Sequence, residues 1–341
     1  MNRRDFLKSA STVTALMMSP SVLKAFEAAP PASAQVAFVK TTDRTAGVAR
    51  AINLLGFGRE RFRGKDLFLK PNFNSADATP GSTHIDTLLA ITRKLKTMGS
   101  GPITIGDRSG MGNTREVMEK KQAFQLGKEL GAKIVVFDDL SADDWELVKH
   151  TDTHWQQGFA LPLIVRNAGG IVQTCCLKTH RFGGHFTLSL KNSVGLAAKY
   201  VPKNSYNFMR ELHSSPHQRR MIAEINAAYH PDLVVLDGVE AFVTGGPDSG
   251  KLVHSNVILA GTDRVAVDAV GVALLRYYGT TPEVSQGAIF EQEQIARAVQ
   301  LGIGVSSASQ IELITGDRES AEYAKQIRTI LDGAPGARPA A

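Results

Sequence analysis

The chain has 341 residues, of which 43% are hydrophobic and 21% charged, with 31 glycines and 14 prolines. This composition is typical of a globular protein with a sizeable core, and it excludes a disordered, collagen-like or disulfide-scaffold protein. The length allows one large or two medium domains. The formal charge of +6 is too small to indicate nucleic-acid binding by itself.

Residues 1–34 have the order of a twin-arginine (Tat) export signal. Arg3 and Arg4 precede an apolar segment to Met18 that is too short to span a bilayer, and a small-x-small site predicts cleavage after Ala34. An ordinary amphipathic helix is the alternative interpretation. We expect the Tat machinery to export the folded protein to the periplasm or another extracytoplasmic space, with no stable membrane anchor after cleavage.

Cleavage at this site would change the net charge and the length of the mature chain. It removes four basic and two acidic residues, which leaves 35 basic and 31 acidic residues and a charge of +4. We expect residues 35–332 to form a single domain, because no repeat or linker divides them, and residues 333–341 to form a disordered tail.

Short apolar runs alternate with helical patterns along the mature chain. The predicted strands are 35–40, 66–70, 103–106, 133–137, 171–177, 233–236, 256–260 and 311–314. The predicted helices are 44–55, 84–98, 114–130, 188–198, 217–229, 264–278, 292–301 and 321–331. This alternation predicts an α/β fold, with a mostly parallel sheet covered by helices on both faces. The stretch 141–167 is expected to form an irregular insertion, and 202–216 a polar connection.

The only two cysteines, Cys175 and Cys176, are adjacent on a predicted strand. Neighbouring strand residues point to opposite faces, so the two thiols are not expected to share a metal, and a disulfide between them needs a distorted backbone. We expect two buried thiols. An iron–sulfur cluster needs about four thiolates, so none is expected from this chain alone.

Polar residues follow several predicted strands. In parallel α/β sheets ligands bind beyond the carboxyl ends of the strands, so these positions are candidates for a functional site. The residues concerned are Lys70 and Asn72, Asp107, Lys178 and His180, and Asp237.

The loop 106–112 joins a strand to a helix and contains three glycines. Glycines allow backbone amides to approach an anion at a helix start. The spacing matches neither the G-x-G-x-x-G dinucleotide fingerprint nor the Walker A pattern, so it does not support nucleotide binding. Asp107 in this loop is a candidate metal ligand or general base, or a turn-forming residue.

A dense group of cationic or titratable residues spans 178–191: Lys178, His180, Arg181, His185 and Lys191. Such a group is suited to a carboxylate, a phosphate or a similar anion. Two adjacent glycines between the histidines are typical of a loop that closes over a ligand. A solvated surface loop is the alternative interpretation.

A metal site is a further alternative for the same residues. His180 and His185 could bind a metal together with Asp107 or Asp237, although four intervening residues are not a recognised helical spacing for metal ligands. Whether a metal or another cofactor binds is left open by the sequence.

Two further acidic residues fit structural roles. Thr262 or Asp263 is expected to cap the helix that begins at 264, and Asp268 is expected to be a buried carboxylate with a partner.

Taken together, the motifs resemble the domain of unknown function 362 (DUF362) family. They are Lys70-Pro71-Asn72, Gly106-Asp107-x-x-Gly110, Lys178-x-His180 with Thr187-Leu188-Ser189-Leu190-Lys191-Asn192-x-x-Gly195, Asp237-Gly238 with Gly245-Gly246-Pro247, and Asp263-x-x-Ala266-x-Asp268-Ala269. The resemblance covers about the whole mature chain. It implies that the polar positions of the family fall on Lys70, Asn72, Asp107, Lys178, His180, Lys191, Asn192, Asp237, Asp263 and Asp268. Many members carry ferredoxin-like iron–sulfur modules beside this domain, which this chain lacks.

The leading hypothesis is an exported enzyme that acts on a small anionic molecule by acid–base or metal-assisted chemistry. Its expected catalytic residues are Asp107, His180, His185 and Asp237, and its expected binding residues are Lys70, Asn72, Lys178, Lys191 and Asn192. The alternatives are a periplasmic ligand-binding protein and a metal-dependent redox partner without catalysis of its own. No basic stripe with interleaved aromatic residues is present, so nucleic acid is not an expected partner.

Overall fold

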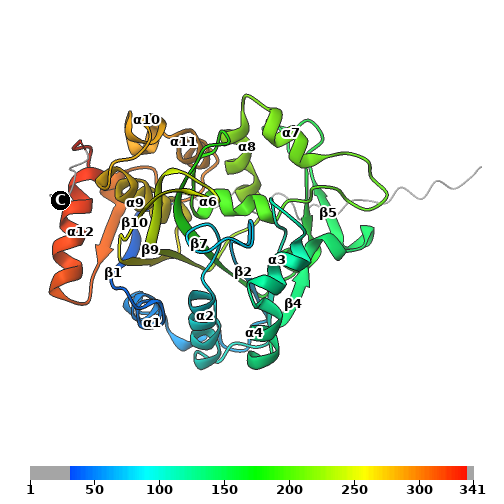
Figure 1. Ribbon diagram of the computed structural model, residues 1–341, viewed down its shortest axis with the longest axis horizontal. Helices are drawn as coiled ribbons and strands as arrows, with labels where there is room; N and C mark the ends of the chain where they lie inside the picture. The colour runs from blue at the N-terminus through cyan, green and yellow to red at the C-terminus, as the bar shows by residue number, and fades with distance from the viewer. Residues whose placement is uncertain (1–30, 336–341) are drawn as a thin grey trace, which may run out of the picture.

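In the computed structural model, which describes residues 31–335, the apolar runs pair into one ten-stranded sheet and a separate two-stranded sheet (Figure 1). The strands are β1 (Ala34–Lys40), β2 (Leu67–Lys70), β3 (Ile103–Asp107), β4 (Lys133–Val136), β5 (Trp145–Val148), β6 (Phe159–Pro162), β7 (Gly170–His180), β8 (His185–Thr187), β9 (Leu233–Gly245), β10 (Gly250–Val253), β11 (Val257–Gly261) and β12 (Ile311–Ile314). All eight predicted strands are present within this set.

Eight strands of the large sheet follow the order β12-β1-β11-β9-β7-β2-β3-β4, while β10 pairs with β9 and β8 with β7. Among the eight, only β11 runs against its neighbours, because it pairs antiparallel with both β1 and β9 and the remaining pairs are parallel. The predicted mostly parallel sheet is therefore confirmed.

Helices cover both faces of this sheet, as predicted (Figure 1). They are α1 (Arg44–Leu54), α2 (Ile85–Thr97), α3 (Thr114–Lys120), α4 (Ala123–Leu130), α5 (Leu163–Arg166), α6 (Ser189–Asn192), α7 (Phe208–Ser214), α8 (Gln218–Ile225), α9 (Arg264–Tyr277), α10 (Pro282–Ser285), α11 (Glu293–Gln300) and α12 (Arg318–Leu331). The alternation along β1 separates two cores: Val36 and Phe38 pack with α9 and α12, whereas Ala37 and Val39 pack with α1 and α2. Every residue of β7 is buried, as expected for a central parallel strand.

The stretch 141–167 forms the predicted irregular insertion. β5 and β6 pair as a small antiparallel sheet, and α5 follows directly. Trp155 and Phe159 from this insertion pack with residues of α7 and α8 in a third hydrophobic cluster. The insertion therefore packs against one end of the large sheet, because Phe68 of β2 and Ile171 of β7 belong to the same cluster.

Four predicted segments differ from the observed elements. The helix predicted over 114–130 is two helices, because Gln122 adopts a left-handed conformation with φ of 58° between α3 and α4. The helix predicted over 188–198 is only α6 and a following 3-10 turn. The connection 202–216 contains α7, which the Asn207 side chain caps. The strand predicted over 233–236 continues to Gly245, because β10 pairs with its second half.

The predicted export signal and tail lie mostly outside the described residues, which exclude 1–30 and 336–341. Ala34, the residue before the predicted cleavage site, begins β1 and pairs with Ile311 of β12. Across residues 31–335, no helix has the length and apolar character needed to cross a membrane.

Candidate anion-binding site

The candidate site lies where the strand order reverses. The chain passes from β2 outward through β3 to β4, and then returns to place β7 on the other side of β2. Lys70 ends β2, Asp107 ends β3, and Lys178 and His180 lie at the end of β7. Such a reversal point is where ligands bind in open α/β sheets. Three of the four strand ends named from the sequence, those of β2, β3 and β7, therefore meet at one place.

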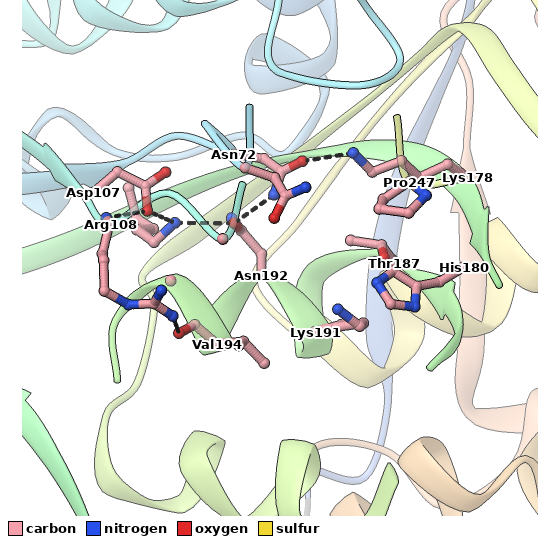
Figure 2. Close-up of a pocket in the computed structure, with 14 residues that line it drawn as sticks. Asn72, Asp107, Arg108, Lys178, His180, Thr187, Lys191, Asn192, Val194 and Pro247 are labelled. Atoms are coloured by element: carbon pink, nitrogen blue, oxygen red, sulfur yellow. Dashed lines mark hydrogen bonds and ion pairs between the residues drawn. The ribbon is translucent and has the colours of Figure 1, made fainter. Parts of the chain in front are cut away.

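A small cavity of about 40 Å³ opens between these strand ends and α6 (Figure 2). One buried water needs about 10–15 Å³ by this measure, so the cavity holds roughly three waters. That space suits one phosphate, carboxylate or comparable group and is too small for a nucleotide. Its lining includes Lys70, Asn72, Asp107, Lys178, His180, Lys191 and Asn192.

One side of the cavity, which we call the paired half, consists of Lys70, Asn72, Asp107 and Asn192. The Lys70 ammonium lies 2.7 Å from Asp107 Oδ1 and also donates to the Pro71 carbonyl at 2.6 Å and to Asn192 Oδ1 at 3.0 Å. Both residues are almost fully buried. Burial lowers the pKa of Lys70, and the charge of Asp107 opposes that shift.

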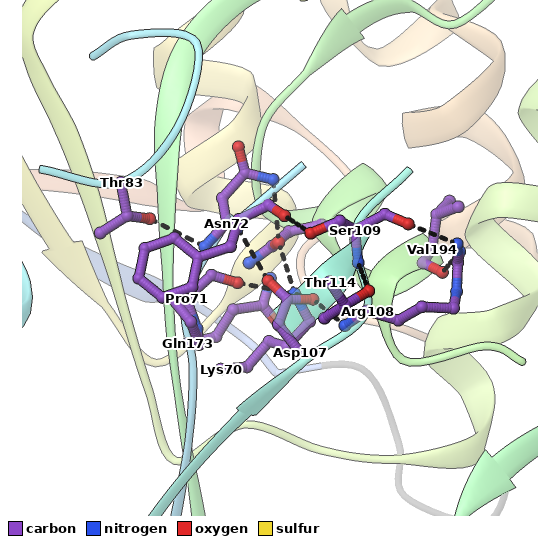
Figure 3. A network of polar contacts seen from close by, with 12 residues as sticks. Lys70, Pro71, Asn72, Thr83, Asp107, Arg108, Ser109, Thr114, Gln173 and Val194 are labelled. Atoms are coloured by element: carbon purple, nitrogen blue, oxygen red, sulfur yellow. Dashed lines mark hydrogen bonds and ion pairs between the residues drawn. The ribbon is translucent and has the colours of Figure 1, made fainter. Parts of the chain in front are cut away.

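Asp107 is fully occupied within this half (Figure 3). Besides Lys70, it accepts the backbone N–H of Phe73 at 2.8 Å and that of Arg108 at 2.7 Å. Both carboxylate oxygens are thus engaged in holding the loops that follow β2 and β3. This geometry suits a structural anchor better than a group that exchanges protons with a ligand.

Two asparagines connect the paired half to Lys178. Asn192 Oδ1 accepts from Asn72 Nδ2 at 3.2 Å, and Asn192 Nδ2 donates to the Thr174 carbonyl at 2.9 Å. Asn72 Oδ1 in turn accepts from Lys178 Nζ at 3.0 Å, and Lys178 also donates to the Gly81 carbonyl. Lys178 therefore has neutral partners, and no carboxylate among the described residues forms an ion pair with it.

The other side, the unpaired half, consists of His180, Thr187 and Lys191. The buried Nδ1 atom of His180 and the buried Oγ1 atom of Thr187 have no hydrogen-bond partner within residues 31–335. The Lys191 side chain, which is about nine-tenths buried, makes neither a hydrogen bond nor an ion pair with that part of the chain. Buried polar groups are normally satisfied, so the two buried unpartnered atoms, with the Lys191 amine beside them, leave hydrogen-bonding capacity open toward the cavity.

The charge around the cavity is strongly positive. Arg108 is buried, and its guanidinium donates hydrogen bonds to backbone carbonyls, including those of Ala197 and Val194, both at 2.9 Å. Burial and the charges of Lys178 and Arg108 lower the pKa of Lys191 to about 7. Burial and the neighbouring lysines also lower the pKa of His180, so its imidazole is neutral at pH 7. An anion entering the cavity would relieve this excess of positive charge.

The hairpin formed by β7 and β8 brings the unpaired half together. Lys178 pairs with Thr187 across this hairpin, and the turn uses Gly183 at a φ of 79°. A Cβ added to Gly184 would lie 2.6 Å from Lys191 Cε and 2.9 Å from His180 Nδ1. Glycine at this position therefore leaves room for Lys191 and His180 to approach each other.

The position of α6 depends on Asp268. Its carboxylate accepts the backbone N–H groups of Ser189 at 2.7 Å and Leu190 at 2.8 Å, the first two residues of α6. Burial raises the pKa of Asp268 to about 8. The expected buried and partnered carboxylate thus fixes the helix that carries Lys191 and Asn192.

Two of the expected catalytic residues lie outside the cavity. Asp237 accepts Arg44 Nε at 2.9 Å, the Thr87 hydroxyl at 2.6 Å and the Val239 N–H at 3.1 Å, so it joins β9 to α1 and α2. His185 lies at the start of β8, in a separate depression. The metal set considered from the sequence is therefore not assembled, and within residues 31–335 no three His, Cys, Asp or Glu side chains gather as a metal site would require.

The remaining sequence predictions near the site concern structural residues. Asp263, one of the two residues considered for this role, caps α9 by accepting the Ala266 N–H at 2.9 Å. Cys175 and Cys176 are both free and buried, as expected.

Three polar side chains that line the cavity were not among the predicted site residues: Asn74, Arg108 and Thr187. Asn74 Nδ2 is another buried atom without a partner among the described residues. Arg108 directly follows β3, and Asn74 lies in the loop that follows β2, and these positions were the available signal for them. Thr187 had no such signal, because its strand β8 was not predicted.

A larger cavity of about 680 Å³ lies at the start of β7, away from the candidate site. Most of its polar groups already have protein partners. Arg264 donates to Asn226 Oδ1 at 2.8 Å and to the Tyr229 carbonyl at 2.6 Å, and Asp232 accepts the Ile171 N–H at 3.0 Å. The smaller cavity is therefore the better candidate despite its size.

The chain contains an α/β domain with polar strand ends that meet in one cavity, and comparison with known families identifies its class. Residues 67–273, more than half of the chain, match the family described as "Domain of unknown function (DUF362)". The chain belongs to this family. All the cavity residues from Lys70 to Asn192, and Asp268 behind α6, fall within the matched range.

Comparison with curated proteins gave no match. Among solved structures, the chain is similar to the lactate racemase apoprotein from Thermoanaerobacterium thermosaccharolyticum, with 16% identity and a TM-score of 0.45 over 72% of this chain and 57% of that one. It is also similar to L-idonate 5-dehydrogenase from Escherichia coli K-12, with 18% identity and a TM-score of 0.21 over 39% of this chain and 33% of that one. The chain thus spans less than two thirds of either protein.

Proposed function

We propose that the protein is an exported enzyme that binds a small anionic molecule in this cavity and acts on it by acid–base chemistry. The observation that carries the proposal is the unpaired half: His180 Nδ1 and Thr187 Oγ1 are buried atoms, the Lys191 side chain is about nine-tenths buried, and none of the three groups has a partner within residues 31–335. Lys178 adds a positive charge beside them that is matched only by neutral acceptors. Together these groups offer donors and charge to one anionic group.

Within this proposal the residues have different roles. Lys178, Thr187 and Lys191 bind the anion, while Lys70, Asn72 and Asn192 hold the cavity in shape. His180 is the proton-transfer group, because its Nδ1 atom is unpartnered and faces the cavity, whereas Asp107 already accepts three hydrogen bonds.

The test measures binding of oxalate, a small dianion, by calorimetry at pH 6.5, followed by recovery of candidate small acids after incubation with the protein. We expect Lys178→Met and Thr187→Val to weaken oxalate binding at least tenfold without loss of the folded state. Lys251→Met, on the exposed strand β10, is the matched control. Unaltered binding in both variants would contradict the site, and bound ligands that are always recovered unchanged would identify a binding protein instead of an enzyme.

Export by the Tat machinery is the second part of the proposal, and it rests on Arg3, Arg4 and the apolar segment after them. Cell fractionation of the native protein, with Arg3→Lys/Arg4→Lys as the variant, tests it. We expect the native chain in the periplasm and the double variant in the cytoplasm. Export that is unaffected by the double variant would contradict the Tat route.

A further inference from the structure

The three lysines of the cavity differ in their partners. Lys70 has an ion pair and two hydrogen bonds, and Lys178 has two neutral acceptors. Lys191 makes no such contact with any residue in the range 31–335, although its side chain is about nine-tenths buried. Burial of most of this side chain removes part of the hydration of its ammonium, and no protein acceptor replaces it, so this environment favours the neutral amine.

The surroundings of Lys191 favour the neutral amine still further. Lys178 and Arg108 are the two cations that act on it, and neither is neutralised by a carboxylate at hydrogen-bond distance. With its pKa at about 7, close to half of the Lys191 side chains are neutral at pH 7. A neutral amine in a cationic pocket is a nucleophile toward carbonyl carbon.

An imidazole lies beside this amine. His180 Nδ1 and Lys191 Cε are both close to Gly184, at 2.9 Å and 2.6 Å from the position that a Cβ would occupy there. Figure 2 shows the Lys191 amine on the side of the cavity where His180 and Thr187 lie. His180 Nδ1 has no protein partner among the described residues, so it is available to move a proton to or from a group bound at Lys191.

We propose, building on the proposed function, that the ligand is a small oxo acid and that Lys191 forms an imine with its carbonyl carbon. The carboxylate binds Lys178 and Thr187. The Lys191 nitrogen attacks the carbonyl carbon, and the carbonyl oxygen takes up the proton that the nitrogen loses, by way of His180. The resulting hydroxyl takes up the second proton of the amine and leaves as water when the C=N bond forms, so the step needs no oxidant or reductant.

The cavity limits the size of this oxo acid. About 40 Å³ is enough for roughly three water molecules, so a two-carbon or three-carbon compound fits and a sugar acid does not. Glyoxylate is therefore a suitable probe, and oxalate is a matched anion that has no reactive aldehyde.

The experiment traps the imine in the full-length folded protein. Glyoxylate is added at pH 7 with sodium cyanoborohydride, and intact mass and peptide mapping measure the carboxymethyl adduct. We expect one adduct at Lys191, at least tenfold above any other lysine. Lys191→Arg keeps the positive charge but removes the nucleophile, so it should lower the adduct at least tenfold, whereas Lys251→Arg should leave it unchanged.

Oxalate binding separates failure of this inference from failure of the proposed function. Oxalate that binds to the native protein, without a specific glyoxylate adduct, overturns the imine and leaves the anion site in place. Absence of both overturns both. Equal labelling of the native protein and folded Lys191→Arg also overturns the imine, because the reaction would then occur elsewhere.

Discussion

The two halves of the cavity contain similar residues, but the polar groups of one half have protein partners and those of the other half do not. In the paired half, Lys70 and Asp107 satisfy each other and are tied to backbone groups on both sides. In the unpaired half, Lys191 and His180 are also buried residues, though slightly more exposed, and neither the Lys191 amine nor His180 Nδ1 has a partner in the described part of the chain. The comparison shows that burial of a charged residue does not identify its role. The presence or absence of ion-pair and hydrogen-bond partners does.

The largest expected effect is on the paired half. Asp107→Asn leaves the Lys70 ammonium buried without its counter-charge, so we expect a loss of about 3–5 kcal/mol in the free energy of unfolding. Chemical denaturation measures it. The control is Asp139→Asn, since Asp139 pairs with Arg115 on the surface, and we expect a loss below about 1 kcal/mol. Equal losses in the two variants would remove the distinction between a buried anchor and a surface pair.

The corresponding change in the unpaired half should affect binding and not stability. Lys191→Met removes an amine that no protein group satisfies, so we expect the free energy of unfolding to stay equal or rise. Oxalate affinity should fall about tenfold or more, because a charged hydrogen bond contributes about 1.5–3 kcal/mol. Calorimetry and denaturation of the same preparation measure both. A clear loss of stability would place Lys191 with the structural residues of the paired half.

The difference between the halves should also depend on pH. The pKa of Lys191 falls to about 7 on folding, so the unfolded chain binds more protons between pH 7 and about 10.5. The stability of the native protein relative to Lys191→Met should therefore rise with pH across this range, by up to about 1.4 kcal/mol per pH unit. Oxalate affinity should fall across the same range as the ammonium is lost. Denaturation of both proteins at pH 6, 8 and 9.5 measures the first trend, and a constant difference between them would contradict it.

The smallest effect is expected outside the cavity. His185 lies at the entrance to β8 with a φ of 64°, a conformation that asparagine tolerates well. We expect His185→Asn to change oxalate affinity by less than about twofold, which corresponds to the small free-energy change of a surface substitution. A larger loss, measured by calorimetry, would extend the unpaired half beyond His180.

The sequence was sufficient for the framework of the site but not for the roles of its residues. Each of the eight strands predicted from the periodicity is present in the structure. The rule that ligands bind at strand ends selected Lys70, Asn72, Lys178 and His180, which do line the cavity. Lys191 and Asn192 were selected by local composition, although the expected helix around them is a single turn.

What the sequence could not supply is the pairing of groups that are distant in the chain. Asp107 and Asp237 look alike as carboxylates after strands, yet one faces Lys70 in the cavity and the other faces Arg44 behind β9. Thr187 depends on a hairpin whose return strand has three residues. Such contacts follow from the packing of the whole sheet, which periodicity does not encode.

The place of β1 has a consequence for how the protein is made. β1 lies between β11 and β12, whose residues 257–261 and 311–314 come much later in the chain. The ribosome must therefore synthesise the chain beyond residue 314 before the sheet can close around β1. Contacts that join the two ends of a chain slow folding, because a long loop must be closed first. The final pairing of β1 can thus form only after β12 has been synthesised.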